Sequence, residues 1–138
     1  MRRLKGKILQ KKLERLSAKI LKTTPTAKGK SADGFKTEIF LLGDAEMKRL
    51  KKKFLPHEKG PANILSFEEP VRWPYPEKGR KILGEIYLNL DLARGKEKIL
   101  APLLLHGIVH LLGYDHKKKG DRIKMEKLEK RISEKLRI

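Results

Sequence analysis

The sequence predicts an α+β fold in which helices pack on a small mixed, mostly parallel β-sheet. Two observations lead to this expectation. Stretches with helical or strand periodicity follow one another in the order helix, strand, helix, strand, strand, helix, helix. The length of 138 residues fits one hydrophobic core, so we expect 1–138 to form a single domain.

The first 34 residues are expected to form a basic helix and a loop. Five apolar residues recur there at roughly helical spacing: Leu4, Ile8, Leu13, Leu16 and Ile20. This period predicts an amphipathic helix over about 4–22, and the Thr, Pro, Gly and Ser residues of 23–34 predict a loop. The segment 1–34 would then precede the rest of the domain, 35–138.

The middle of the chain contains the predicted strands. A β-prone run at 37–42 and a compact apolar run at 63–67 predict two strands, and a helix is expected between them at 44–54. Prolines make 71–79 an irregular excursion. The third strand is expected at 82–90, because this run is also apolar and β-prone.

Two further helices are expected after the strands. The most apolar stretch, 96–112, is too long for a strand and predicts a buried helix. Pro102 lacks a backbone N–H, so we expect a kink or a helix start near it. A last basic amphipathic helix is predicted by a regular apolar stripe: Met125, Leu128, Ile132 and Leu136.

The formal net charge of +18 is concentrated in two parts of the chain. Residues 1–30 contribute +10 and residues 117–138 contribute +6, which leaves +2 for 31–116. Basic helices on both sides of a nearly neutral body favour a polyanionic partner, and nucleic acid is the first candidate. The alternative is that the lysines only keep the surface soluble.

The composition also excludes several classes of protein. Without cysteine the chain has no disulfide, no thiolate metal site and no thiol nucleophile, so a tight metal site must use His, Asp or Glu. No apolar run approaches the roughly 18 to 20 residues that cross a bilayer. We therefore expect a soluble cytoplasmic protein that does not bind membranes.

Three of the four histidines lie close together in the sequence: His106, His110 and His116. The first two are one helical turn apart and share a helix face, where both can bind one ion. A third ligand must arrive from another direction, and Gly113 can end the helix in a left-handed conformation so that the chain turns back to His116. The alternative is that the three are unrelated core and turn residues.

Three neutral imidazoles leave one position of a tetrahedral zinc ion open for water, which is the arrangement of a zinc-hydrolase-like histidine helix. Zinc lowers the pKa of bound water to about 7. The pattern therefore predicts one zinc ion per chain and a metal-dependent hydrolase, with 35–138 as its metal-dependent catalytic core. Asp115 would either orient a ligand imidazole through its second nitrogen or form a turn.

The residue after the first histidine is Gly107. The same histidine spacing occurs in the metzincin zinc proteases, which carry a glutamate at this position as general base. Because Gly107 cannot accept a proton, a metalloprotease is only a minor alternative. A phosphodiester substrate is favoured, since its cleavage can use metal hydroxide or the 2′-hydroxyl of RNA, with basic side chains stabilising the charge.

The run HGIVHLLGYDH at 106–116 resembles the signature of the YbeY family of bacterial endoribonucleases. ANILSF at 62–67 is similar to the family strand Thr-Asn/Asp-Val-Leu-Ser-Phe, and LGEI at 83–86 is similar to its Leu-Gly-Asp-Ile. The likeness extends over about 37–136.

This resemblance implies a zinc ion held by His106, His110 and His116. It also implies a single-strand-specific endoribonuclease that matures ribosomal RNA, notably the 3′ end of the small-subunit RNA, and acts in ribosome quality control. The expected partner is RNA, as ribosomal RNA or within the small ribosomal subunit. The oligomeric state is left open.

The chain departs from the family pattern at three places, one of which is Ala62 in place of the usual threonine. Many members carry an arginine in the loop before the 62–67 strand, where this chain has Leu55 and Pro56. Four lysines can supply positive charge to RNA there, without the bidentate fork of arginine: Lys51, Lys52, Lys53 and Lys59. Glu85 replaces an aspartate. A non-catalytic, basic RNA-binding factor of ribosome assembly with a structural metal is therefore an alternative function.

Overall fold

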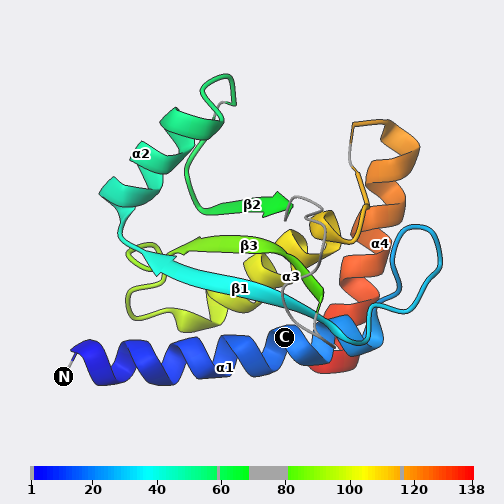
Figure 1. Cartoon of the computed structure of the whole chain (residues 1–138), viewed down its shortest axis with the longest axis horizontal. Coiled ribbons are helices and arrows are strands. Elements are labelled where there is room, and N and C mark those ends of the chain that lie inside the picture. Colours follow the sequence, from blue (N-terminus) through cyan, green and yellow to red (C-terminus); the bar gives the residue numbers. More distant parts are fainter. Residues whose placement is uncertain (1, 59, 69–80, 116) are drawn as a thin grey trace.

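The computed structural model describes residues 2–58, 60–68, 81–115 and 117–138 (Figure 1). The chain folds into helices and a small sheet, which confirms the predicted α+β class. The elements in chain order are α1 (Arg2–Thr23), β1 (Phe35–Leu42), α2 (Asp44–Phe54), β2 (Ile64–Glu68), β3 (Lys81–Asn89), a 3₁₀ turn η1 (Glu97–Ile99), α3 (Leu100–Leu111) and α4 (Lys119–Leu136).

Within the described residues, the sheet has three strands in the order β1-β3-β2, with β3 in the centre. β1 runs parallel to β3, whereas β2 runs antiparallel to β3. The sheet is therefore mixed, as predicted, but the expectation of mostly parallel strands is wrong. The connection from β1 to β3 includes α2 and is long enough for a parallel crossover, while β2, the described strand that precedes β3 in the chain, pairs with β3 in the opposite direction.

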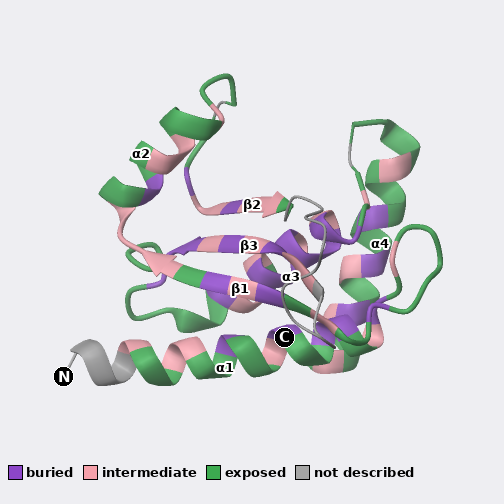
Figure 2. Cartoon of the chain, in the orientation of Figure 1, coloured by how far each residue is buried: buried purple, intermediate pink, exposed green. Residues whose placement is uncertain are grey.

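The two faces of the sheet bury different sets of side chains. Ile86 and Leu88 of β3 belong to the main core, together with buried residues of α1, α3 and α4. Tyr87 points to the other face, where it packs on a smaller cluster built around Met47 and Leu65. Figure 2 shows the buried residues on the strands and on the inward sides of the helices. Helices α1 and α3 thus cover one face of the sheet, α4 packs on these two helices, and α2 packs near the other face.

Helix α3 approaches the sheet closely because two glycines leave room for it. Gly107 of α3 is buried against Ile64 and Ile86, and Gly84 of β3 is buried beneath Leu111. Any side chain at these two positions would enter space that is already filled. The close packing fixes α3 on the sheet and, with it, the direction in which the helix presents its histidines.

The basic helix α1 packs on β1 rather than projecting from the core. The hydroxyl groups of Ser17 and Thr37 form a buried hydrogen bond between the two elements. The Gln10 side chain donates a further hydrogen bond of 2.6 Å to the backbone oxygen of Ile39. The first part of the chain is therefore held to the sheet by polar contacts as well as by apolar burial.

The observed bounds agree with most of the expected elements. The helix expected over 96–112 begins at Leu100 after the 3₁₀ turn, so that Pro102 lies in its first turn, where a missing N–H costs no helical hydrogen bond. The excursion expected at 71–79 lies outside the described residues. No helix within the described residues is both long and apolar enough to span a membrane.

Candidate metal centre

Helix α3 presents two histidines on one side of its surface. The ring centroids of His106 and His110 are 5.0 Å apart, and their planes are inclined by 87°. Both side chains are partly exposed, while the intervening Gly107, Ile108 and Val109 are buried. One face of α3 therefore packs on the sheet, and the face with the two histidines stays accessible. The four-residue spacing predicts that the histidines share a face.

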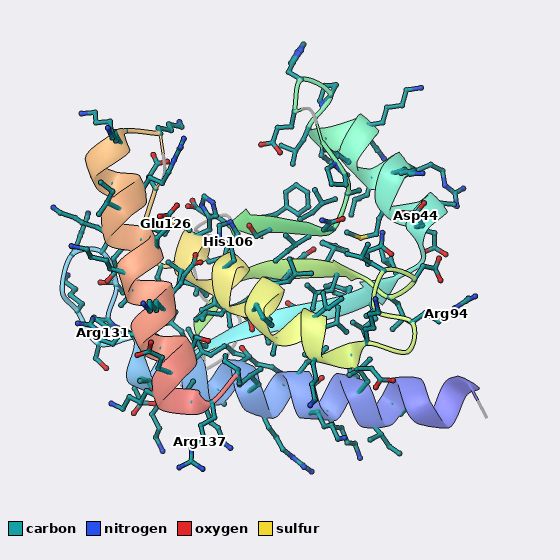
Figure 3. The ribbon with its side chains drawn as sticks, turned by 180° about the vertical axis from the view of Figure 1, so that it is seen from behind. Asp44, Arg94, His106, Glu126, Arg131 and Arg137 are labelled. Atoms are coloured by element: carbon teal, nitrogen blue, oxygen red, sulfur yellow. The ribbon has the colours of Figure 1, made fainter. Side chains whose placement is uncertain are left out.

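A carboxylate from α4 contacts the first of these histidines. The Nδ1 atom of His106 lies 2.7 Å from the Oε1 atom of Glu129. The His106 side chain is 40% exposed and the Glu129 side chain 25% exposed, so the pair lies at the edge of the packed interior. Figure 3 labels His106 on the part of α3 that faces α4. The second helix therefore contributes directly to the histidine site.

The turn after α3 is fixed against the loop that follows α1. Gly113 has a φ of 99°, a left-handed conformation that glycine adopts without strain, as predicted for the end of this helix. The backbone N–H of Ala27 donates to the Leu112 oxygen at 2.9 Å. The Tyr114 hydroxyl donates to the Pro25 oxygen at 3.1 Å. These contacts hold the direction in which the chain leaves the helix.

The third predicted ligand, His116, lies outside the described residues. Within the described ranges, no third His, Asp, Glu or Cys joins His106 and His110 in a group that could hold a metal ion. The donor set fits zinc nevertheless, because two imidazoles already share one accessible helix face. The metal site therefore stays a prediction that the placement of two of its three ligands supports.

Asp115 occupies the turn between the helix and His116. Its Oδ1 atom accepts a hydrogen bond of 3.0 Å from the backbone N–H of Lys117. A carboxylate that accepts from the backbone two residues later forms an Asx-type turn. One of the two predicted roles of Asp115 is thus seen, and its role in orienting a ligand imidazole stays a prediction.

Glu85 lies on the opposite face of the sheet from α3. Its carboxylate accepts a hydrogen bond from the Tyr87 hydroxyl. Burial, and then this hydrogen bond, raise the pKa of Tyr87 to about 12. The Tyr87 ring also stacks on Phe40, with centroids 4.8 Å apart. In the described structure Glu85 is therefore a partner of Tyr87, and it does not lie on the face where α3 packs.

The predicted RNA-binding lysines lie in and after the last turn of α2. The Lys51 ammonium donates to the Gly60 backbone oxygen, and the Lys53 ammonium lies 5.3 Å from the centroid of the Phe54 ring. Lys52 is exposed, and Lys59 lies outside the described residues. The segment that includes Leu55 and Pro56 follows directly and carries no arginine. Positive charge is present at this end of α2, but its contact with RNA stays a prediction.

Glu129 is not among the residues that the sequence predicts for the histidine site. Four acidic residues occur in 117–138, and nothing in their spacing to His106 separates one from another. A partial signal was present, because Glu129 follows Leu128 in the apolar stripe of α4 and so lies at the margin of the buried helix face. Only the packing of α4 beside α3 identifies the contact.

Comparison with known proteins identifies relatives that all carry the same name. A family model described as endoribonuclease YbeY matches residues 2–137. A protein named endoribonuclease YbeY from Aquifex aeolicus is 35% identical over 96 residues, which are 62% of this chain and 59% of that protein. The protein of the same name from Solibacter usitatus is 34% identical over 113 residues, or 76% of this chain and 69% of its own length.

A third relative, from a Wolbachia species, has the same name and is 35% identical over 103 residues. That match covers 68% of this chain and 64% of the relative. The chain thus spans about three-fifths to two-thirds of the length of these relatives. The similarity includes both the sheet and the histidine helix, since the family match runs through every described element.

Proposed function

The chain belongs to the YbeY family, and from this premise we propose that it is a zinc-dependent endoribonuclease specific for single-stranded RNA. Its substrate would be ribosomal RNA, including the 3′ end of the small-subunit RNA, and its wider role would include ribosome quality control. It would act in the cytoplasm, on free ribosomal RNA or on the small ribosomal subunit. Three relatives named endoribonuclease YbeY support the nuclease part of this proposal.

The observation that carries the proposal is the pair of histidines on α3. His106 and His110 share an accessible helix face, and the chain leaves that helix through a glycine turn that leads to His116. Imidazole nitrogens suit zinc, and three of them leave a coordination position open. A zinc ion held by the three histidines would act as a Lewis acid on the scissile phosphodiester.

The chain's own basic side chains would stabilise the negative charge that develops during cleavage. Cleavage of a phosphodiester develops negative charge on phosphate oxygens, which lysine and arginine stabilise. Lys52 and Lys53 are exposed at the end of α2, and the net charge of +18 favours binding of a polyanion. These lysines would hold the phosphate backbone, without the bidentate contact that an arginine offers.

The packing of Gly107 weighs against the metalloprotease alternative. A general-base glutamate would have to stand at this position, directly after the first histidine. Gly107 faces the sheet, where a Cβ atom would come within 2.7 Å of the Ile64 Cδ1 atom. A glutamate here would be directed against apolar side chains of the sheet, so this position does not suit the proton acceptor of that mechanism.

A second candidate function is a non-catalytic RNA-binding factor of ribosome assembly that uses the metal for structure. One observation favours it: no arginine occurs between Arg49 and Arg72, where many family members carry one. Such a factor would bind RNA with a steep dependence on salt, and its binding would survive removal of the metal as long as the fold survived.

Metal analysis combined with an RNA cleavage assay tests the proposal. We expect one zinc ion per purified chain, and cleavage of single-stranded RNA that is lost in His110→Ala. The variant His57→Ala is the matched control, because His57 is exposed in the loop after α2 and is not a predicted ligand. Equal cleavage by the wild type and His110→Ala would show a contaminating nuclease and overturn the enzyme proposal. Zinc binding and RNA binding without cleavage would favour the assembly factor.

A further inference from the structure

The contact between α3 and α4 carries an inference beyond the three predicted zinc ligands. We propose that Glu129 is a positioning residue, whose carboxylate holds the Nδ1–H group of His106 and so directs the Nε2 atom of that ring to the metal. This proposal rests on the proposed zinc site. It assigns a role to a residue of α4, an element that supplies none of the predicted ligands.

The first support is the geometry of the contact. The Nδ1 and Oε1 atoms are 2.7 Å apart, which is the length of a hydrogen bond strengthened by a charged partner. Glu129 is three-quarters buried at its side chain, so water competes only weakly for the carboxylate. The imidazole ring has two nitrogens, and this contact occupies Nδ1 alone.

The second support is the chemistry of the two groups. An ionised carboxylate accepts hydrogen bonds and donates none, so the Nδ1 atom of His106 must carry the proton. In a neutral imidazole the lone pair then lies on the other nitrogen, Nε2, and this is the form that binds a metal. The negative carboxylate also makes the ring a stronger electron donor.

The third support is that the fold fixes both partners independently. Gly107 packs His106's helix against the sheet, and Leu128 and Ile132 anchor α4 in the main core on either side of Glu129. The carboxylate therefore meets a ring whose helix cannot slide or rotate freely. Loss of Glu129 would remove the hydrogen bond that keeps the proton on Nδ1, while the two helices keep their packing.

Zinc affinity provides the first test. We expect Glu129→Ala to weaken zinc binding by about 10- to 100-fold in competition with a chelator, the range typical of outer-sphere partners of metal-bound histidines. Glu129→Gln should weaken it less, because the amide oxygen still accepts the hydrogen bond but without the charge. Glu134→Gln is the control, since it makes the same change of charge at an exposed position of α4. Unchanged affinity in Glu129→Ala would overturn the proposal.

The tautomer of His106 provides a second readout that needs no metal. Long-range proton–nitrogen correlation spectra of the metal-free protein separate the two tautomers of a neutral imidazole. We expect the Nδ1–H form in the wild type and in Glu134→Gln, and a shift toward the Nε2–H form in Glu129→Ala. The His106 signals are identified by their absence in His106→Gln. An unchanged tautomer in Glu129→Ala would contradict the positioning role.

The two readouts separate this inference from the proposed function. If every Glu129 variant binds one zinc ion per chain with the affinity of the wild type, the proposed zinc enzyme is retained but the positioning role of Glu129 is ruled out. A wild type that binds no zinc but shows the Glu129-dependent tautomer would remove the zinc function, and with it the metal-directed role, while the hydrogen bond itself remained. Thermal unfolding of each metal-free variant identifies any that has lost the fold.

Discussion

Gly107 of α3 lies directly against Ile64 of β2, and a Cβ atom on the glycine would come within 2.7 Å of the Ile64 Cδ1 atom. We therefore predict that Gly107→Glu, which restores the residue of the metzincin pattern, does not create a protease. It should instead lower the free energy of unfolding by about 3 kcal/mol or more, because a carboxylate is forced into filled apolar space. Urea denaturation followed by circular dichroism measures the change.

The alanine variant at the same position is the control for this prediction. In Gly107→Ala the only severe contact is with the end of the Ile64 side chain, which can move by rotation. The decrease in stability caused by crowding is then offset by the higher helix propensity of alanine, which contributes about 1 kcal/mol. We expect a stability within about 1 kcal/mol of the wild type. A Glu variant as stable as the Ala variant would show that the helix can turn away from the sheet.

A second close approach occurs at Gly84 in the central strand. A Cβ atom there would collide with the Phe67 backbone oxygen and lie 2.9 Å from the Leu111 Cδ2 atom. Because backbone cannot rotate away as a side chain can, we predict that Gly84→Ala lowers the free energy of unfolding by about 2 to 3 kcal/mol. Gly6→Ala in α1 has no atom within 4 Å of its new Cβ and should be neutral or stabilising. Equal effects of the two variants in thermal unfolding would contradict this account.

Asn89 joins three segments through a buried amide. Its Nδ2 atom donates to Asp44 Oδ1 at 2.9 Å and to the Ala62 oxygen at 3.1 Å, and its Oδ1 atom accepts from the Leu92 N–H at 3.2 Å. The side chain is buried, so Asn89→Ala leaves polar groups of its neighbours without a partner. We predict a loss of about 2 to 4 kcal/mol in unfolding free energy. A loss below about 0.5 kcal/mol in urea denaturation would show that water replaces the amide.

The elements of this fold could be predicted because their signals are local. The helical period of the first segment and the length of the 96–112 run identify α1 and α3 from the sequence alone. The direction of β2 could not be predicted in the same way, because a strand's apolar pattern is the same whichever way the strand runs. The mixed sheet was expected, but the antiparallel pairing appears only in the structure.

The candidate site also has a part that local sequence patterns predict and a part that depends on tertiary packing. The spacing of His106 and His110 fixes their common helix face, since both lie on one element. The contact of His106 with Glu129 joins two helices that are brought together by tertiary packing, and no local pattern encodes it. The burial of Gly107 likewise depends on the sheet beneath α3. The sequence alone therefore places the predicted ligands that share one element, but it does not identify a contact with another element.

Tyr87 predicts a dependence of stability on pH. Burial and the hydrogen bond to Glu85 raise its pKa to about 12 in the folded state, against an unperturbed value of about 10 in the unfolded state. Between these values the folded state holds a proton that the unfolded state has released, so stability falls as the pH rises. The contribution is complete below about pH 10 and is lost as the pH passes about 12.

Comparison of the wild type with Tyr87→Phe checks this behaviour, because phenylalanine keeps the ring and removes the titrating hydroxyl. We expect the stability advantage of the wild type to shrink as the pH is raised from about 9 to about 11, measured by urea denaturation at each pH. The titrations of other groups affect both proteins equally and cancel in the difference. Parallel stability curves for the two proteins would mean that Tyr87 does not titrate with a raised pKa.

The lysines near the end of α2 predict that the affinity for RNA depends measurably on salt concentration. Lys52 and Lys53 are exposed, and Lys59 follows them in the sequence. If each neutralises one phosphate of single-stranded RNA, replacing all three by glutamine should reduce the slope of log affinity against log salt concentration by about 2. Fluorescence anisotropy with labelled RNA at several salt concentrations measures the slope. The triple arginine variant, which keeps the charge, should retain it. An unchanged slope in the glutamine variant would place the RNA contact on the other basic helices, α1 and α4, rather than on the end of α2.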